Sequence, residues 1–159
     1  FNRVLVPIDF TDSAEQAIPL AYASVRSGGE VRLVHVVAPT QPNEIPTARN
    51  GSGPAESQEF SARLEALIPK AATNRGITTQ REVVAHREPA AAICAAADRF
   101  DADLICMGSR GRSHFKEAFF GSVSQEVMAQ SDRAVLVLRG TERRRSVEVM
   151  QQEPIECGV

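Results

Sequence analysis

The residues best suited to chemistry in this sequence are three glycines and two serines that follow one predicted strand. Gly108 and Gly111 come just after an apolar run, and Gly121 precedes Ser122 and Ser124. Glycines let the backbone approach a ligand closely, and a helix that begins near Gly121 presents free amide groups and the positive end of its dipole. A strand, a glycine loop and a helix start together form an anion site. The sequence therefore predicts that phosphate binds here.

The spacing of these glycines differs from that of two common phosphate loops. It reads Gly, two residues, Gly, nine residues, Gly-Ser, so it lacks the lysine of a Walker loop and the compact glycines of a dinucleotide-binding turn. Taken singly, each glycine is explained as well by an ordinary turn or helix cap. Together they favour phosphate contact, with hydroxyl donors from Ser122 and Ser124 and added positive charge from Arg112. Ser122 to Gln125 is also a capping-box pattern, which predicts a helix start at that point.

Alternating strand and helix patterns surround this loop and predict a doubly wound α/β fold with a parallel sheet. Pro19 falls inside the first predicted helix and should bend it, and Pro69 should disturb the second. The strand at 77–85 carries polar interruptions, as edge strands do. The predicted strands are 4–8, 31–37, 77–85, 103–107 and 134–138, and the predicted helices are 12–25, 56–75, 89–100 and the segment from 121 onward.

Three motifs in the same order resemble those of the universal stress protein family. They are the glycine pattern, the Arg3-Val-Leu-Val-Pro-Ile-Asp9 run and the Leu33-Val-His-Val36 run, and the resemblance extends from about residue 3 to 139. It implies a single five-stranded parallel sheet of the adenine nucleotide alpha hydrolase-like type, with strand order 3-2-1-4-5 and helices on both faces. It also implies that an adenine nucleotide lies across the crevice between the first and fourth strands. We expect a nucleotide-binding domain at 1–140 and a tail at 141–159.

The predicted site gathers residues that follow the first, second and fourth strands, because ligands bind at the carboxyl ends of parallel strands. Asp9 either contacts the nucleotide or accepts amide hydrogen bonds from the following helix. Arg87 stands where relatives commonly carry glycine, so it either reaches the ligand or crowds it. By resemblance and position, the site residues are Pro7, Asp9, Val36, Met107, Gly108, Gly111, Arg112, Gly121, Ser122, Val123 and Ser124.

The composition of the chain argues against some classes of binding partner. The formal charge of −2 and the isoelectric point near 6.0 argue against general binding to nucleic acid or to an anionic membrane. No apolar run approaches the roughly 20 residues that span a bilayer. The chain opens on a predicted strand rather than a signal peptide. Its three cysteines lack a C-x-x-C pairing, and two of them fall in predicted buried elements, so we expect a cytoplasmic protein with reduced thiols.

These features lead to one main functional hypothesis and two alternatives. The first is a stress-response protein that binds ATP, ADP or AMP as a nucleotide-dependent switch, with little or no hydrolysis and no catalytic residues or protein metal ligands. Magnesium or manganese would be carried by the phosphates. The second is an interaction module that binds no nucleotide. The third, a pyrophosphatase, lacks support because no glycine pair follows the first strand. We expect a homodimer that pairs through the apolar edge strand 134–138.

Overall fold

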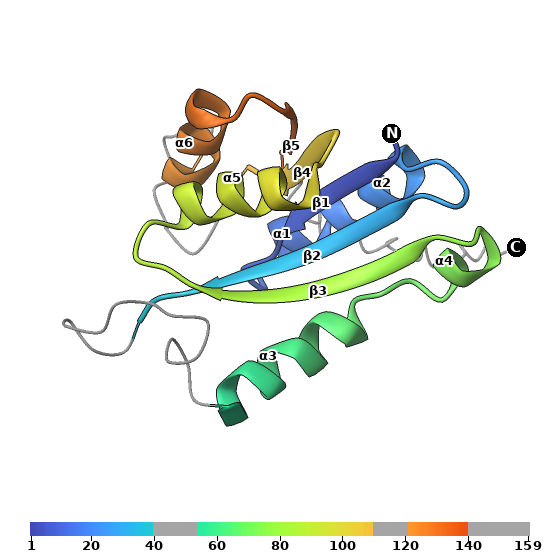
Figure 1. The fold of residues 1–159 in the computed structure, drawn as a ribbon, viewed down its shortest axis with the longest axis horizontal. Coiled ribbons are helices and arrows are strands. Elements are labelled where there is room, and N and C mark those ends of the chain that lie inside the picture. Colours follow the sequence, from blue (N-terminus) through green and yellow to red (C-terminus); the bar gives the residue numbers. More distant parts are fainter. Residues whose placement is uncertain (40–53, 110–120, 140–159) are drawn as a thin grey trace, which may run out of the picture.

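The computed structural model describes residues 1–39, 54–109 and 121–139 of the chain. Its five strands are all parallel and lie in the order β3-β2-β1-β4-β5, which confirms the predicted doubly wound fold (Figure 1). In chain order the elements are β1 Arg3–Pro7, α1 Asp12–Glu15, α2 Ala17–Ser24, β2 Glu30–Val37, α3 Pro54–Ala66, α4 Ala71–Asn74, β3 Thr78–Ala85, α5 Pro89–Phe100, β4 Leu104–Gly108, α6 Ser122–Gln130 and β5 Ala134–Leu138.

Two apolar layers bury the sheet from both sides. On one face, residues of α1, α2, α3 and α4 pack against alternate strand residues such as Val4 and Leu33. On the other face, α5 and α6 pack against the intervening residues, such as Leu5 and Val34, and Figure 1 shows these two helices together on one side of the sheet. Because side chains alternate along a strand and both faces are covered, the central strands read as continuous apolar runs.

Prolines divide two of the predicted helices. The predicted helix 12–25 is two helices, because Pro19 has no N–H to donate to the carbonyl of Glu15, where α1 ends. The predicted helix 56–75 is shorter than expected. It ends as α3 at Ala66, and the short α4 follows Pro69. The breaks confirm the expected effect of both prolines.

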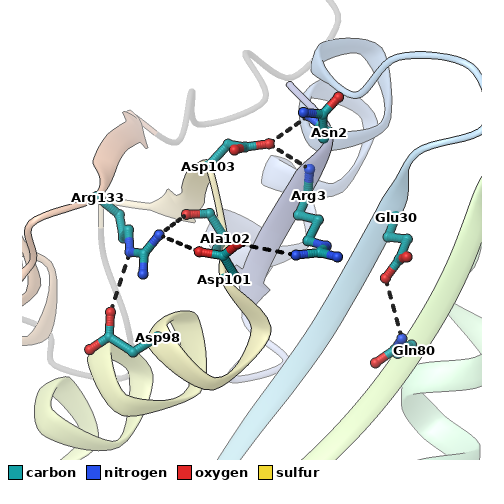
Figure 2. A network of polar contacts seen from close by, with 9 residues as sticks. All are labelled: Asn2, Arg3, Glu30, Gln80, Asp98, Asp101, Ala102, Asp103 and Arg133. Carbon is teal, nitrogen blue, oxygen red and sulfur yellow. Dashed lines mark hydrogen bonds and ion pairs between the residues drawn. The ribbon is translucent and has the colours of Figure 1, made fainter.

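A network of polar contacts lies at the end of the sheet where the strands begin (Figure 2). Asp103 Oδ2 accepts hydrogen bonds from the backbone N–H groups of Asn2 and Arg3, at 2.6 and 2.8 Å. Arg133 reaches Asp101 at 3.0 Å and also the carbonyl oxygen of Ala102 at 3.2 Å. Figure 2 also shows an ion pair between Asp98 and Arg133 and another between Asp101 and Arg3. These contacts tie the starts of β1 and β4 to the end of α5.

The edges of the sheet lie where the sequence placed them, at β3 and β5. Pairing of two copies through β5 stays a prediction. No helix in the described ranges has the length and apolar character needed to cross a membrane. The predicted tail, 141–159, lies outside the described residues.

Candidate functional site

A cavity of about 550 Å³ opens at the carboxyl ends of β1, β2 and β4, with α3, α5 and α6 completing its walls. Every predicted site residue that the structure describes lines it: Pro7, Asp9, Val36, Met107, Gly108, Gly121, Ser122, Val123 and Ser124. Gly111 and Arg112 lie outside the described residues. Segments far apart in the sequence therefore meet in a hollow of the size that small-molecule sites have.

The start of α6 forms one wall and differs from the predicted capping box. Gly121, not Ser122, is the N-cap residue, and no side chain caps the helix. The first backbone hydrogen bond of the helix runs from Gln125 N–H to the Gly121 carbonyl at 3.1 Å. Among the described residues, the N–H groups of Ser122, Val123 and Ser124 have no partner. Three backbone donors at the positive end of a helix dipole therefore border the cavity.

Ser124 has a different position from the one that we predicted for its hydroxyl. The side chain is buried, and its Oγ lies 2.9 Å from the Gly121 carbonyl oxygen and 3.3 Å from that of Ser109. A hydroxyl has one proton, so this donor is directed at the protein backbone. Ser124 can offer a ligand its amide N–H, whereas its hydroxyl stabilises the turn into α6.

Ser109 is a residue that the sequence analysis overlooked. It is fully buried and lines the cavity, its N–H donates to the Leu138 carbonyl at 2.6 Å, and its carbonyl accepts from Gly121 N–H at 2.6 Å. Its Oγ, in contrast, has no hydrogen-bond partner within the described part of the chain. A buried polar group without a partner is uncommon and needs an explanation.

Gly108 is required by packing as well as by any ligand. A Cβ built on it would lie 2.5 Å from the carbonyl oxygen of Ser13 and 2.7 Å from Ser13 Oγ. Helix α1 therefore rests directly on the backbone of β4, which leaves no room for a side chain. The glycine that we predicted for phosphate approach is explained first by this helix-strand contact.

Asp9 combines both roles considered for it in the sequence. Its Oδ1 accepts from the N–H of Thr11 at 3.1 Å and from the Thr11 hydroxyl at 2.6 Å. Its Oδ2 has no partner among the described residues and the side chain lines the cavity. The carboxylate is thus anchored by one oxygen, while the other can accept a hydrogen bond from a ligand.

An aromatic cluster lies behind Asp9 and also escaped the sequence analysis. Phe10 has a φ of 60°, a left-handed conformation that is strained for a bulky residue. Its ring stacks on Phe60 of α3 with centroids 6.0 Å apart and meets His35 at 4.7 Å, while the Arg63 guanidinium lies 3.8 Å from its centroid. His35 Nδ1 also lies 2.6 Å from the Ile8 carbonyl oxygen. Phe60 and His35 reach the cavity wall from elements far apart in the chain.

Three more polar side chains line the cavity: Glu56 from α3, and His86 and Arg87 after β3. The sequence analysis singled out only Arg87, because it replaces a glycine, and the structure places it on the cavity wall. Glu56 and His86 carried no local pattern that distinguished them from ordinary surface residues.

Neither a metal-ligand cluster nor a reactive cysteine thiol is seen at the cavity in the described residues. In the described ranges no group of His, Cys, Asp and Glu residues is arranged to hold a metal ion. Burial raises the pKa of the Cys106 thiol to about 11, and its Sγ lies 3.6 Å from the Ala17 carbonyl oxygen. Cys106 is a protonated core residue at neutral pH, as predicted.

Comparison with known proteins gives the same fold and the same family. The sequence model of the universal stress protein family matches residues 1–139. A universal stress protein of Thermus aquaticus is 30% identical over 143 residues, covering 87% of this chain and 99% of the relative. Universal stress protein MJ0577 of Methanocaldococcus jannaschii is 27% identical, covering 87% and 95% of the two chains. The solved structure of MJ0577 superimposes with a TM-score of 0.70 at 26% identity, covering 89% of this chain and 97% of that one. With its sheet order, its glycine pattern and a family match that spans all the described residues, this chain belongs to the universal stress protein family.

Proposed function

We propose that this protein binds ATP, or another adenine nucleotide, with its phosphates at the start of α6. The observation that carries the proposal is the set of unpartnered donors at that wall of the cavity: the N–H groups of Ser122, Val123 and Ser124. The first amides of a helix have no intrahelical partner, and a helix N-terminus favours negative charge. A phosphate group supplies both the acceptors and the charge.

The rest of the cavity suits a nucleoside. Pro7, Val36, Met107 and Phe60 give it apolar walls, and Asp9 Oδ2 offers an acceptor for a sugar hydroxyl or a base amine. Two structures of the same fold bear on this point. One is a universal stress protein of Archaeoglobus fulgidus in complex with dAMP, and the other is a universal stress protein in complex with cAMP. Family membership and cavity chemistry together favour an adenine nucleotide.

A nucleotide-dependent switch in a stress response is the role that we propose for this binding, with little or no hydrolysis. No lysine occurs among the described residues that line the cavity. These residues therefore lack the positive charge with which the lysine of a Walker loop contacts the phosphates. Magnesium or manganese, if present, would be carried by the phosphates, since no protein ligand cluster lies within the described ranges.

The first experiment measures nucleotide content and affinity. Protein purified without added ligand is denatured and its supernatant separated by chromatography, and ATP is then titrated by calorimetry into the wild type, Gly121→Glu and Gly121→Ala. Gly121 has φ −71°, which any residue adopts, so both variants should fold. We expect Gly121→Glu to weaken ATP binding at least about 100-fold through charge repulsion, and Gly121→Ala to weaken it only a few-fold.

The outcome that contradicts the proposal is a wild-type protein that carries no nucleotide and gives no heat with ATP. That result would favour the second hypothesis, a module that acts through protein partners. Equal loss in both Gly121 variants would instead place the effect in the helix cap and not in charge.

A further inference from the structure

We infer that His86 is a specificity-determining residue, whose Nε2–H group donates a hydrogen bond to a ring nitrogen of the bound purine base. This inference rests on the proposed function and deepens it, since it names the side chain that contacts the base. His86 is half-buried and lines the cavity, and its Nε2 has no hydrogen-bond partner among the described residues.

The hydrogen bonds of Glu88 decide which ring nitrogen of His86 carries the proton. His86 Nδ1 lies 3.0 Å from the backbone nitrogen of Glu88 and 2.9 Å from its carbonyl oxygen. That carbonyl already accepts from the N–H of Ala92 at 3.1 Å, whereas the Glu88 N–H has no other acceptor within the described part of the chain. We therefore assign Nδ1 as the acceptor of this N–H, which in the neutral ring places the proton on Nε2.

His86 and the start of α6 lie at the ends of different strands. The N–H of His86 donates to the Val37 carbonyl at 3.0 Å, so His86 extends β3 beside the end of β2. The start of α6 is held at the end of β4 by the hydrogen bond from Gly121 to Ser109. Because β2 and β1 separate β3 from β4, the two points are three strand spacings apart, about 14 Å. A nucleotide with its phosphates at α6 therefore extends its nucleoside across β1 and β2 toward His86.

The apolar walls near His86 suit a flat base. Val84 packs in the layer of α5 and α6, and His86, two residues later and still paired with β2, faces the same side of the sheet. Val36 and Ile93, two apolar residues that line the cavity, belong to that layer as well. A few polar groups among apolar walls fix the orientation of a ligand. Adenine ring nitrogens are hydrogen-bond acceptors, so an N–H donor complements them.

Two substitutions separate the contact with Glu88 from the contact with the base. In His86→Asn the side-chain oxygen can still accept the Glu88 N–H, as Asn does in turns, but nothing replaces Nε2. His86→Ala removes both groups. Calorimetry measures the Kd for ATP, and urea unfolding without ligand measures stability. We expect both variants to bind ATP about 3- to 10-fold more weakly, the usual loss for one hydrogen bond, and only His86→Ala to have a lower unfolding midpoint.

Deaza analogues of ATP identify the base atom that His86 contacts. The 1-deaza, 3-deaza and 7-deaza analogues each replace one ring nitrogen with C–H. We expect one of them to bind the wild type about 3- to 10-fold more weakly than ATP does. The same analogue should bind His86→Asn as well as ATP does, because that variant already lacks the hydrogen bond.

Two results would overturn the inference and leave the proposed function intact. Wild-type affinity for ATP in His86→Asn would limit the role of His86 to the turn at Glu88. Analogues that lose the same factor in the variant as in the wild type would show that no ring nitrogen is coupled to His86. A wild-type protein that does not bind ATP would refute the proposed function and this inference together.

Discussion

The two ends of the sheet treat their polar groups in opposite ways. Where the strands begin, Asp103 accepts from two backbone amides, and Arg133 joins two carboxylates and a carbonyl (Figure 2). Where the strands end, Ser109 Oγ, one oxygen of Asp9 and the first amides of α6 have no partner among the described residues. One end satisfies its hydrogen bonds within the chain. The other has several polar groups without a partner in the described ranges, and we propose that a nucleotide pairs with the Asp9 oxygen and the amides.

Under the proposed function, this contrast predicts which residues support the fold and which support binding. Substitutions at the beginning of the strands should change stability and leave nucleotide affinity alone. Substitutions at the end of the strands should change affinity, with stability affected only where the site also carries packing. Gly108 is such a place, since α1 rests on it.

The largest effect on stability should follow Gly108→Ala. This variant tests whether the contact of α1 with β4, at the end of the sheet where the strands finish, stabilises the fold. The added Cβ would lie 2.5 Å from the Ser13 carbonyl oxygen, so helix and strand must move apart. We expect a loss of about 1–3 kcal/mol in the free energy of unfolding, as for other overpacked sites, together with weaker ATP binding. Urea unfolding and calorimetry on the same preparation measure both. A variant with wild-type stability and wild-type affinity would show that α1 can move away from β4 at little cost in free energy.

A smaller effect should follow Asp103→Asn at the opposite end. Hydrogen bonds from the backbone amides of Arg3 and Asn2 lower the pKa of this carboxyl below its ordinary value of 3.8. The charged form is therefore stabilised in the folded state, and this contribution is fully present above about pH 5, falls below that pH, and is lost once the pH has passed through the lowered pKa. Because the group is exposed, we expect about 1 kcal/mol or less at pH 7. Urea unfolding at pH 7 and pH 3 should show a weaker pH dependence in the variant, with ATP affinity unchanged.

The smallest effect should follow Arg133→Gln, which sharpens the comparison by removing several ion pairs at once. The partners Asp98 and Asp101 are mostly exposed, and exposed ion pairs contribute little. We expect a slight decrease in the unfolding midpoint at low salt that nearly disappears in high salt, where the pairs are screened. Nucleotide affinity should equal that of the wild type. A clear loss of affinity would contradict the separation of the two ends.

Local patterns predicted the fold well because strand and helix periods, prolines and glycines act over a few residues. Pro19 and Pro69 marked real helix breaks. Local pattern failed at the α6 cap, where Ser122 looks like the better N-cap. Gly121 takes that position in the structure, and its N–H is held by Ser109, twelve residues earlier.

The candidate site was predictable where the motif is contiguous and not where distant elements meet. Met107, Gly108 and the residues after Gly121 lie on the cavity as the spacing indicated. Phe60 and His35 belong to a cluster joined across α3 and β2, and neither residue alone marks that contact in the sequence. Ser109 carries no signal beyond its neighbour Gly108. Its buried hydroxyl, which has no hydrogen-bond partner within the described part of the chain, is a feature that only three-dimensional contacts reveal.

The left-handed Phe10 has a consequence for the order in which this molecule is assembled. Such a conformation costs on the order of 1–3 kcal/mol, and the ring that holds it is clamped by Phe60 and Arg63, about fifty residues later in the chain. Phe10 stands between Asp9 and Thr11, so the turn that aims the carboxylate is secured only after α3 has docked. A chain in which β1 has paired with β2 but α3 has not yet docked therefore has part of its sheet without the ordered turn at Asp9. Under the proposed function, we expect nucleotide binding to require docked α3, so that the ability to bind arises after the sheet has formed.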